Sequence, residues 1–278
     1  MSLPRVISLA LFRPLPGEHR HADALDHFPR FLPALLRAAR ELFRGWEVWV
    51  HHDDGLDSCY YGSTLKLLAR QGYLRLVYCG PVAALCHAML WRLYPALDGA
   101  AEHVLCRDLD SLATPRERHA VEGWLRSGRA LHVMHDHAHH ASPGARAFIP
   151  GGMFGLHVPA FRHLTGLTNM RQLLVHAQQL GVSLHAKGDD QVVLNSLLPP
   201  LIGDDYLLHA YDPGTGHAAV DPVALPGVDK RALARGNALT PYTGGVFDVA
   251  PVVAFYNQLP SSNPIHWAEQ QTGEAVPH

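Results

Sequence analysis

The sequence predicts an α/β fold: a single domain in which helices flank a mostly parallel central sheet. From Val6 to Asp110, short apolar runs of strand length alternate with segments of helical periodicity. Parallel neighbours need long crossover connections, which these helical segments would supply. The chain has 278 residues, 47% of them hydrophobic and 17% charged, and this is enough for a sizeable core. No internal repeat or linker divides it.

The expected elements follow from periodicity, turn residues and capping signals. Strands are expected at 6–12, 46–51, 74–78, 103–107, 131–134, 182–185 and 205–210, with a further candidate within 148–158. Helices are expected at 28–42, 63–70, 82–93, 115–127, 170–180 and 187–198. Pro29 and Pro33 leave the start of the first helix open, and Pro199-Pro200 should end the last. Thr114 followed by Pro115 and Glu117 gives the strongest helix start.

Composition narrows the function classes. The formal net charge of −2 argues against nucleic acid as a partner. The four cysteines form no C-x-x-C pair, which indicates a reducing compartment. The first apolar run is too short to span a membrane and has no secretory cleavage pattern. A cytoplasmic protein is therefore expected, with oligomeric state open.

Two aspartates, Asp108 and Asp110, follow the apolar run at 103–107. Alternate residues of an extended chain point the same way, so the two carboxylates can share one hard cation. The pair lies at the carboxyl end of an expected buried strand, where open α/β sheets bind ligands. The alternative is a surface turn or a helix cap, both frequent uses of aspartate.

Other expected strands end in polar residues. Phe12 and Arg13 close the first, while Asp53 and Asp54 close the second. By the same rule of placement these four are candidates for contact with a nucleotide, although Asp53 and Asp54 also fit a solvated turn.

The three glycines Gly151, Gly152 and Gly155 admit close approaches that a side chain would block. They fit either a turn facing a substrate or a bulge beside a packed helix.

Four features in chain order carry a resemblance. They are Arg107-Asp108-Leu109-Asp110-Ser111, Gly151-Gly152-Met153-Phe154-Gly155, Asp190-Gln191-Val192-Val193-Leu194-Asn195, and the late His209. Together they resemble the nucleotide-sugar glycosyltransferases of the Rossmann-like GT-A fold. Within these, D-Q-x-x-L-N and the late histidine are similar to the retaining branch that includes glycogenin and the galactosyltransferases of bacterial lipopolysaccharide synthesis. The late H-x-x-G-x-x-K-P-W segment of that branch is absent.

The resemblance implies a metal-dependent, hexosyltransferase-like enzyme that moves a sugar from a nucleotide-diphosphate sugar, with a UDP-sugar expected, to a small-molecule or glycan acceptor. Asp108, Asp110 and His209 would hold Mn²⁺ or Mg²⁺, which neutralises charge on the leaving diphosphate. Arg107 and Lys187 would add positive charge there.

For catalysis, the resemblance and the chemistry point to Asp190, whose carboxylate would stabilise an oxocarbenium-like centre with retention. Gln191 would bind the sugar or the acceptor. If the reaction inverts, Asp189 or Asp190 would be the general base. Both aspartates also fit a helix cap and first-turn acid. Residues 1–112 would bind the nucleotide, 113–212 would supply acceptor binding and catalysis, and 213–278 would form a loop-rich tail.

Two alternatives remain. The residues from His135 to His140 include His-x-His spacing and Asp136, which suit Zn²⁺, Fe²⁺ or Ni²⁺ in a metallohydrolase or another metal enzyme, or form only a solvated loop. An inactive transferase fold acting as a binding module is also compatible with the sequence.

Overall fold

The computed structural model describes residues 2–13, 32–58, 62–81, 85–109, 111, 113–135, 149–185 and 188–210. Within these residues the strands are β1 (Arg5–Leu11), β2 (Trp46–His52), β3 (Arg75–Tyr78), β4 (His103–Arg107), β5 (Leu131–His135), β6 (Met153–His157) and β7 (Tyr206–Ala210). They form one seven-stranded sheet in the order β3-β2-β1-β4-β6-β5-β7. The expected tail at 213–278 lies outside the described residues.

The sheet is mostly parallel, as predicted. β1 pairs in parallel with β2 and β4, β2 with β3, and β5 with β7. β6 is the exception among the described strands, because it runs antiparallel to both β4 and β5. The α/β fold class predicted from the sequence is confirmed.

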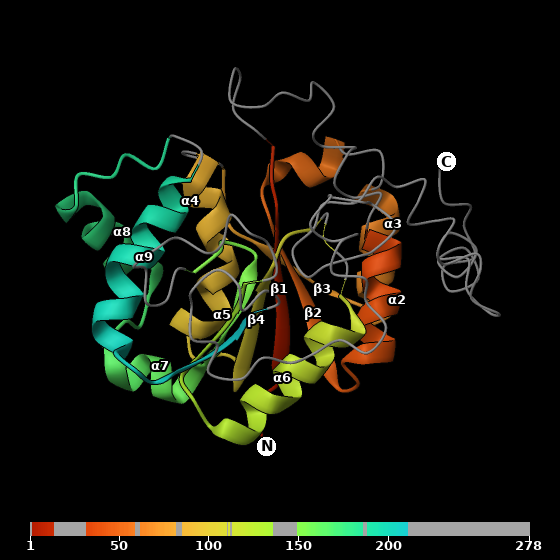
Figure 1. Ribbon diagram of the computed structural model, residues 1–278. Helices are drawn as coiled ribbons and strands as arrows, with labels where there is room; N and C mark the ends of the chain where they lie inside the picture. Colours follow the sequence, from red (N-terminus) through yellow and green to blue (C-terminus); the bar gives the residue numbers. More distant parts are fainter. Residues whose placement is uncertain are drawn as a thin grey trace, which may run out of the picture.

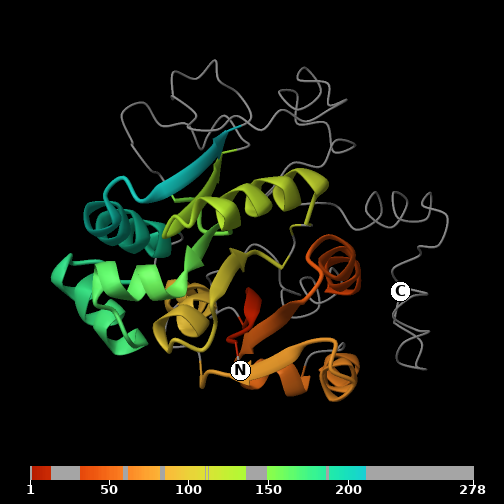
Figure 2. The same ribbon diagram turned by 90° about the horizontal axis from the view of Figure 1, so that it is seen from below.

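Helices cover both faces of the sheet (Figures 1 and 2). They are α2 (Leu32–Leu42), α3 (Gly62–Arg70), α4 (Leu85–Leu90), α5 (Tyr94–Leu97), α6 (Pro115–Ser127), α7 (Val158–Thr165), α8 (Met170–Gln179) and α9 (Asp189–Ile202), with the 3₁₀ turns η2 (Asp54–Ser58) and η3 (Trp91–Leu93). None of the helices within the described residues has the length and hydrophobicity needed to cross a membrane.

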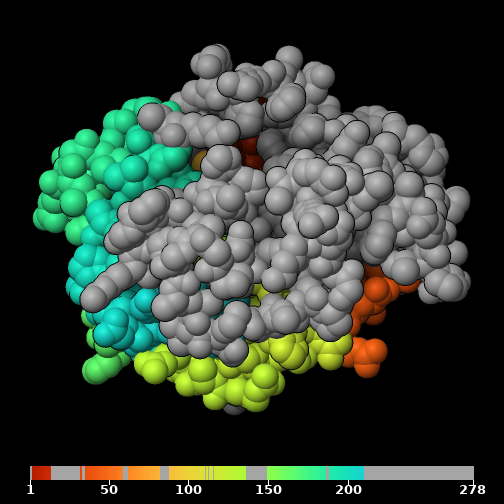
Figure 3. Space-filling view, viewed as in Figure 1, coloured from red at the N-terminus to blue at the C-terminus, as the bar shows by residue number. Residues whose placement is uncertain are grey.

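Two apolar cores lie against the two faces. One gathers side chains from α2, α3 and α6, and the other from α4, α5, α7, α8 and α9. Side chains of β4 alternate between them: Leu105 belongs to the α6 side, while Val104 and Cys106 belong to the α9 side. In the space-filling view α6 runs along the lower edge, and α8 and α9 form the left side (Figure 3).

Helix α6 begins as the sequence predicts. Thr114 is its N-cap, and its hydroxyl accepts a hydrogen bond of 3.1 Å from the backbone N–H of Glu117. Pro115 occupies the first helical position, and Gly128 ends the helix with φ of 68°.

Three boundaries differ from expectation. The strand expected at 182–185 is wrong: Leu184 has φ of 62°, in the left-handed region, and the N–H of Val182 bonds back to Ala177 of α8. The expected end at Pro199-Pro200 is also wrong, because α9 continues to Ile202. Its last turn lacks two N–H donors and closes through a bond from Gly203 to the carbonyl of Pro199.

The third difference concerns the single helix expected at 82–93. The described part of this segment is divided into α4 and η3, and α5 follows at once. The 3₁₀ turn has a consequence for the site, because it carries Arg92.

Candidate active site

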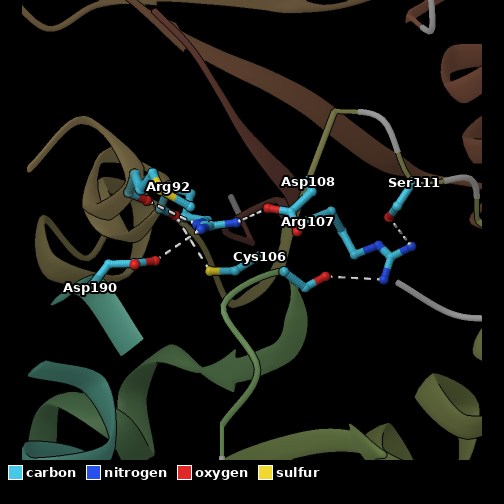
Figure 4. A network of polar contacts seen from close by, with 8 residues as sticks. Arg92, Cys106, Arg107, Asp108, Ser111 and Asp190 are labelled. Carbon is cyan, nitrogen blue, oxygen red and sulfur yellow. Dashed lines mark hydrogen bonds and ion pairs between the residues drawn. The ribbon is translucent and has the colours of Figure 1, made fainter. Parts of the chain in front are cut away.

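A buried guanidinium, that of Arg92, lies at the centre of the site (Figure 4). Its Nη1 is 2.5 Å from Oδ1 of Asp108, just beyond β4, and its Nη2 is 3.4 Å from Oδ2 of Asp190, in the first turn of α9. Its Nε donates to the carbonyl of Met89 at 2.9 Å. Arg92 therefore joins η3, the end of β4 and the start of α9.

Charge explains why this arginine can be buried. The side chains of Arg92 and Asp190 are 4% and 1% exposed, whereas that of Asp108 is 41% exposed. Burial opposes the charge of Arg92, but the two nearby carboxylates outweigh it and raise its pKa. Two carboxylates against one guanidinium leave one net negative charge, and its exposed part is on Asp108.

The glycines expected to allow a close approach do so. A β-carbon at Gly151 would be 3.2 Å from Oδ2 of Asp190, and one at Gly152 would overlap the carboxylate of Asp108. Both glycines form the floor of the carboxylate pair. Gly155 has a packing role, because its β-carbon would lie 2.9 Å from Leu105 on the α6 side.

The structure turns Arg107 away from Asp108. Its Nε forms an ion pair of 3.1 Å with Glu117 of α6, and its Nη2 donates to Ser111. Its Nη1 donates to the carbonyl of Gly152 at 3.1 Å. With its side chain 4% exposed, Arg107 supports the glycine segment from the opposite face and is not placed to contact phosphates.

His209 is not brought to Asp108 either. It lies on β7 on the α6 side of the sheet, with Nε2 3.5 Å from where a β-carbon of Gly123 would be and its ring 5.3 Å from that of His132. Asp110 and Lys187 lie outside the described residues, so their expected roles remain predictions.

A divalent cation can be tested against the groups present. Among the described residues no group of three or more His, Cys, Asp or Glu side chains is placed to hold a metal ion. Mg²⁺, however, commonly binds through one or two carboxylates with substrate phosphates completing the shell. The part-exposed carboxylate of Asp108 fits that mode.

The expected nucleotide contacts lie together beyond β1 and β2. Asp53 ties the two strand ends, since its Oδ2 accepts from the N–H of Arg13 at 3.0 Å and its Oδ1 from Gly55 at 2.9 Å. It is 6% exposed, which favours the turn alternative for this residue. Asp54 accepts from the hydroxyl of Tyr78 at 2.7 Å. The ring of Phe12 packs edge-on against that of Trp91.

At the start of α9, Gly188 is the N-cap, so Asp189 and Asp190 occupy the first turn and complement the helix dipole. Asp189 accepts a hydrogen bond of 3.1 Å from the hydroxyl of Ser183, away from Arg92. The Cγ of Gln191 would be 3.5 Å from a β-carbon at Gly151. The structure thus brings Asp190 and Gln191, but not Asp189, to the glycines.

Sequence reasoning missed Arg92. The signal was the single charged residue within the apolar run Met89-Leu90-Trp91-Arg92-Leu93. A buried arginine needs a counter-charge, and the two carboxylates singled out elsewhere were available. Of the histidine segment, His135 is buried at the end of β5, and residues 136–140 lie outside the described part of the chain.

No protein-family model matches the chain, and no curated protein matches it in sequence. Among solved structures it is similar to the glycosyltransferase GlyE of Streptococcus pneumoniae, with 12% identity and a TM-score of 0.45 over 75% of this chain. This match covers 45% of GlyE, so the chain spans less than half of that protein.

Two nucleotidyltransferases show comparable similarity. One is 4-diphosphocytidyl-2C-methyl-D-erythritol synthase from Anaerococcus prevotii, with 12% identity and a TM-score of 0.40 over 85% of this chain and 97% of that one. The other, from Bacillus anthracis, is described as a glucose-1-phosphate thymidylyltransferase, with 9% identity and a TM-score of 0.41 over 76% and 87%.

Proposed function

We propose that this protein is a metal-dependent glycosyltransferase that moves a sugar from a nucleotide-diphosphate sugar, a UDP-sugar being the expected donor, to a small-molecule or glycan acceptor. The observation that carries the proposal is the joining of Asp108 and Asp190 by Arg92 over the floor formed by Gly151 and Gly152. This places two carboxylates of different exposure at the carboxyl end of β4, where open α/β sheets bind nucleotides.

Asp108, with Asp110, would hold Mn²⁺ or Mg²⁺, and the metal would neutralise the charge that develops on the leaving diphosphate. Arg92 keeps the Asp108 carboxylate oriented. Residues 1–112 would bind the nucleotide, residues 113–212 the sugar and acceptor, and residues 213–278 would form a tail around them.

Asp190 would face the anomeric carbon. Its carboxylate is fixed by Arg92 and lies against Gly151, where no side chain separates it from a sugar. A carboxylate held there would stabilise positive charge at the reacting carbon, with retention of configuration. Gln191, beside the same glycine, would orient the sugar or the acceptor.

The first test is a thermal-shift panel of UDP-, GDP-, CMP- and dTDP-sugars with and without Mn²⁺, because a ligand that binds only the native state raises its melting temperature. We expect a shift that requires both one sugar nucleotide and the metal. Asp108→Ala should abolish it, and Asp204→Ala, which removes an exposed carboxylate before β7, should leave it intact.

The product separates this proposal from its competitors. Sugar transfer releases a nucleoside diphosphate, whereas nucleotidyl transfer to a sugar phosphate releases pyrophosphate, and the latter product would overturn the proposal. A shift caused by Zn²⁺ or Fe²⁺ alone and lost in His137→Ala would indicate a metallohydrolase. Failure of every nucleotide and metal to bind would leave the fold as a binding module.

A further inference from the structure

The side-chain amide of Asn195 binds the backbone of Ile149 in both directions. Its Oδ1 accepts from the N–H of Ile149 at 2.7 Å, and its Nδ2 donates to the carbonyl of the same residue at 3.0 Å. The Nδ2 also donates to the carbonyl of Gln191 at 2.8 Å, one turn earlier in α9. The amide therefore acts like one residue of a neighbouring strand.

The sequence prepares Ile149 for this pairing. Because Pro150 follows, Ile149 is biased toward extended backbone conformations. In an extended residue the N–H and C=O point to the same side, so a single planar amide can reach both. A carboxylate or a hydroxyl cannot supply the matching acceptor and donor in one plane.

This pairing fixes the floor of the carboxylate site. Beyond Ile149 the chain turns, with the N–H of Met153 bonded to the carbonyl of Pro150 at 3.2 Å. Within this turn lie Gly151, against Asp190, and Gly152, against Asp108. Arg107 holds the far end of the turn from the opposite face of the sheet.

We infer that Asn195 is a positioning residue, which sets the height of the Gly151-Gly152 turn against Asp190 and thereby shapes the sugar subsite of the donor site. The inference rests on the proposed function, because it assigns the two carboxylates to the binding of a sugar nucleotide. It concerns the sugar and not the nucleotide, since Asn195 acts on α9 and on the glycine turn, whereas the expected nucleotide contacts lie beyond β1 and β2.

The test compares Asn195→Asp and Asn195→Leu with Ser196→Ala. Aspartate keeps the acceptor for the N–H of Ile149 but turns an anionic oxygen toward its carbonyl, and leucine removes all three hydrogen bonds. The control is matched, because the hydroxyl of Ser196 bonds only to carbonyls within α9, those of Val192 and Val193.

Two properties are measured. The first is steady-state transfer, with binding of the nucleoside diphosphate and Mn²⁺ measured in parallel. Both Asn195 variants should lower kcat by about 10- to 100-fold, as small displacements of a reacting group do, and leave the affinity for the nucleoside diphosphate within about twofold. Ser196→Ala should change neither. Equal losses of kcat and nucleoside diphosphate affinity, or no loss at all, would overturn the inference.

The second is amide hydrogen exchange over residues 149–153, which requires no activity. Exchange there should be faster in both Asn195 variants than in wild type and Ser196→Ala, and unchanged exchange overturns the inference. If wild type binds no sugar nucleotide but exchange is accelerated, the proposed function fails while the structural link from Asn195 to the turn stands.

Discussion

The carboxylate of Asp108 occupies the space that a β-carbon on Gly152 would fill, so the acid packs directly on the glycine backbone. In Gly152→Ala the new methyl group must displace this side chain, which is part-exposed and can rotate toward solvent. We expect loss of metal-dependent nucleotide binding, measured by calorimetry, with little change in melting temperature.

Gly155→Ala is the contrasting variant. Its methyl group would meet Leu105 at 2.9 Å and the ring of Trp124 at 3.0 Å in the core beneath α6. Overpacking of this kind costs about 1–3 kcal/mol of stability. Melting temperature should fall with binding retained at low temperature, and a reversed pattern in the two variants would contradict the site.

Arg92→Met should destabilise the fold strongly. The substitution keeps much of the apolar stem but leaves the buried carboxylate of Asp190 without its nearest positive charge, and such losses cost about 3–5 kcal/mol. Urea unfolding at pH 7 measures the change. Adding Asp190→Asn should recover part of it, because the buried charge is then removed.

A surface arginine supplies the control for this experiment. Arg118 pairs with Glu122 at 2.8 Å on the exposed side of α6. Arg118→Met should change stability little, since exposed ion pairs contribute little. Equal effects of the two substitutions would show that Arg92 does not have the buried role described.

Thr114→Ala should weaken the start of α6 by about 1 kcal/mol, because the N–H of Glu117 loses its side-chain acceptor. Thr114→Ser retains the hydroxyl and should remain close to wild type. Chemical unfolding of the three proteins side by side measures the difference, and indistinguishable alanine and serine variants would refute the capping role.

Stability should decrease as pH falls below about 6.5. Burial lowers the pKa of His51 and of His103 to about 4, and that of His132 well below its usual value. Between pH 6.5 and 4 the unfolded chain therefore binds more protons than the native state, which favours unfolding. His51 alone should contribute about 1.4 kcal/mol per pH unit in that range.

Urea unfolding at intervals from pH 7.5 to 5 gives the slope. His51→Gln should make it shallower, whereas His119→Gln, at an exposed position on α6, should leave it unchanged. A slope that is the same in wild type and His51→Gln would contradict the assignment of the buried neutral histidine.

The parallel part of the sheet was predictable because its signals are local. Each strand is a short apolar run, and α6 has its own start signal at Thr114. The antiparallel direction of β6 was not predictable in this way, because Met153 to His157 reads as an apolar run whichever way it is inserted between β4 and β5. Likewise, Val182 to His185 has strand-like composition, but the turn after α8 places Leu184 at positive φ.

The site divides along the same line. Asp108, Asp190 and the glycine pair could be singled out by motif, and they do meet. The surroundings of Arg107 and His209 could not be anticipated, because strand alternation turns both toward α6 and only the sheet register shows which face that is. The same reason hid Arg92 and Asn195, whose partners are distant in sequence.

That distance bears on synthesis of the protein. Arg92 and Asp108 are 16 residues apart, but Arg92 and Asp190 are 98 residues apart. A nascent chain that has not yet emerged as far as α9 can form the first ion pair and not the second. A ribosome-stalled chain ending before α9 would carry a half-neutralised arginine in an incomplete core, so we expect it to remain sensitive to protease until α9 has docked.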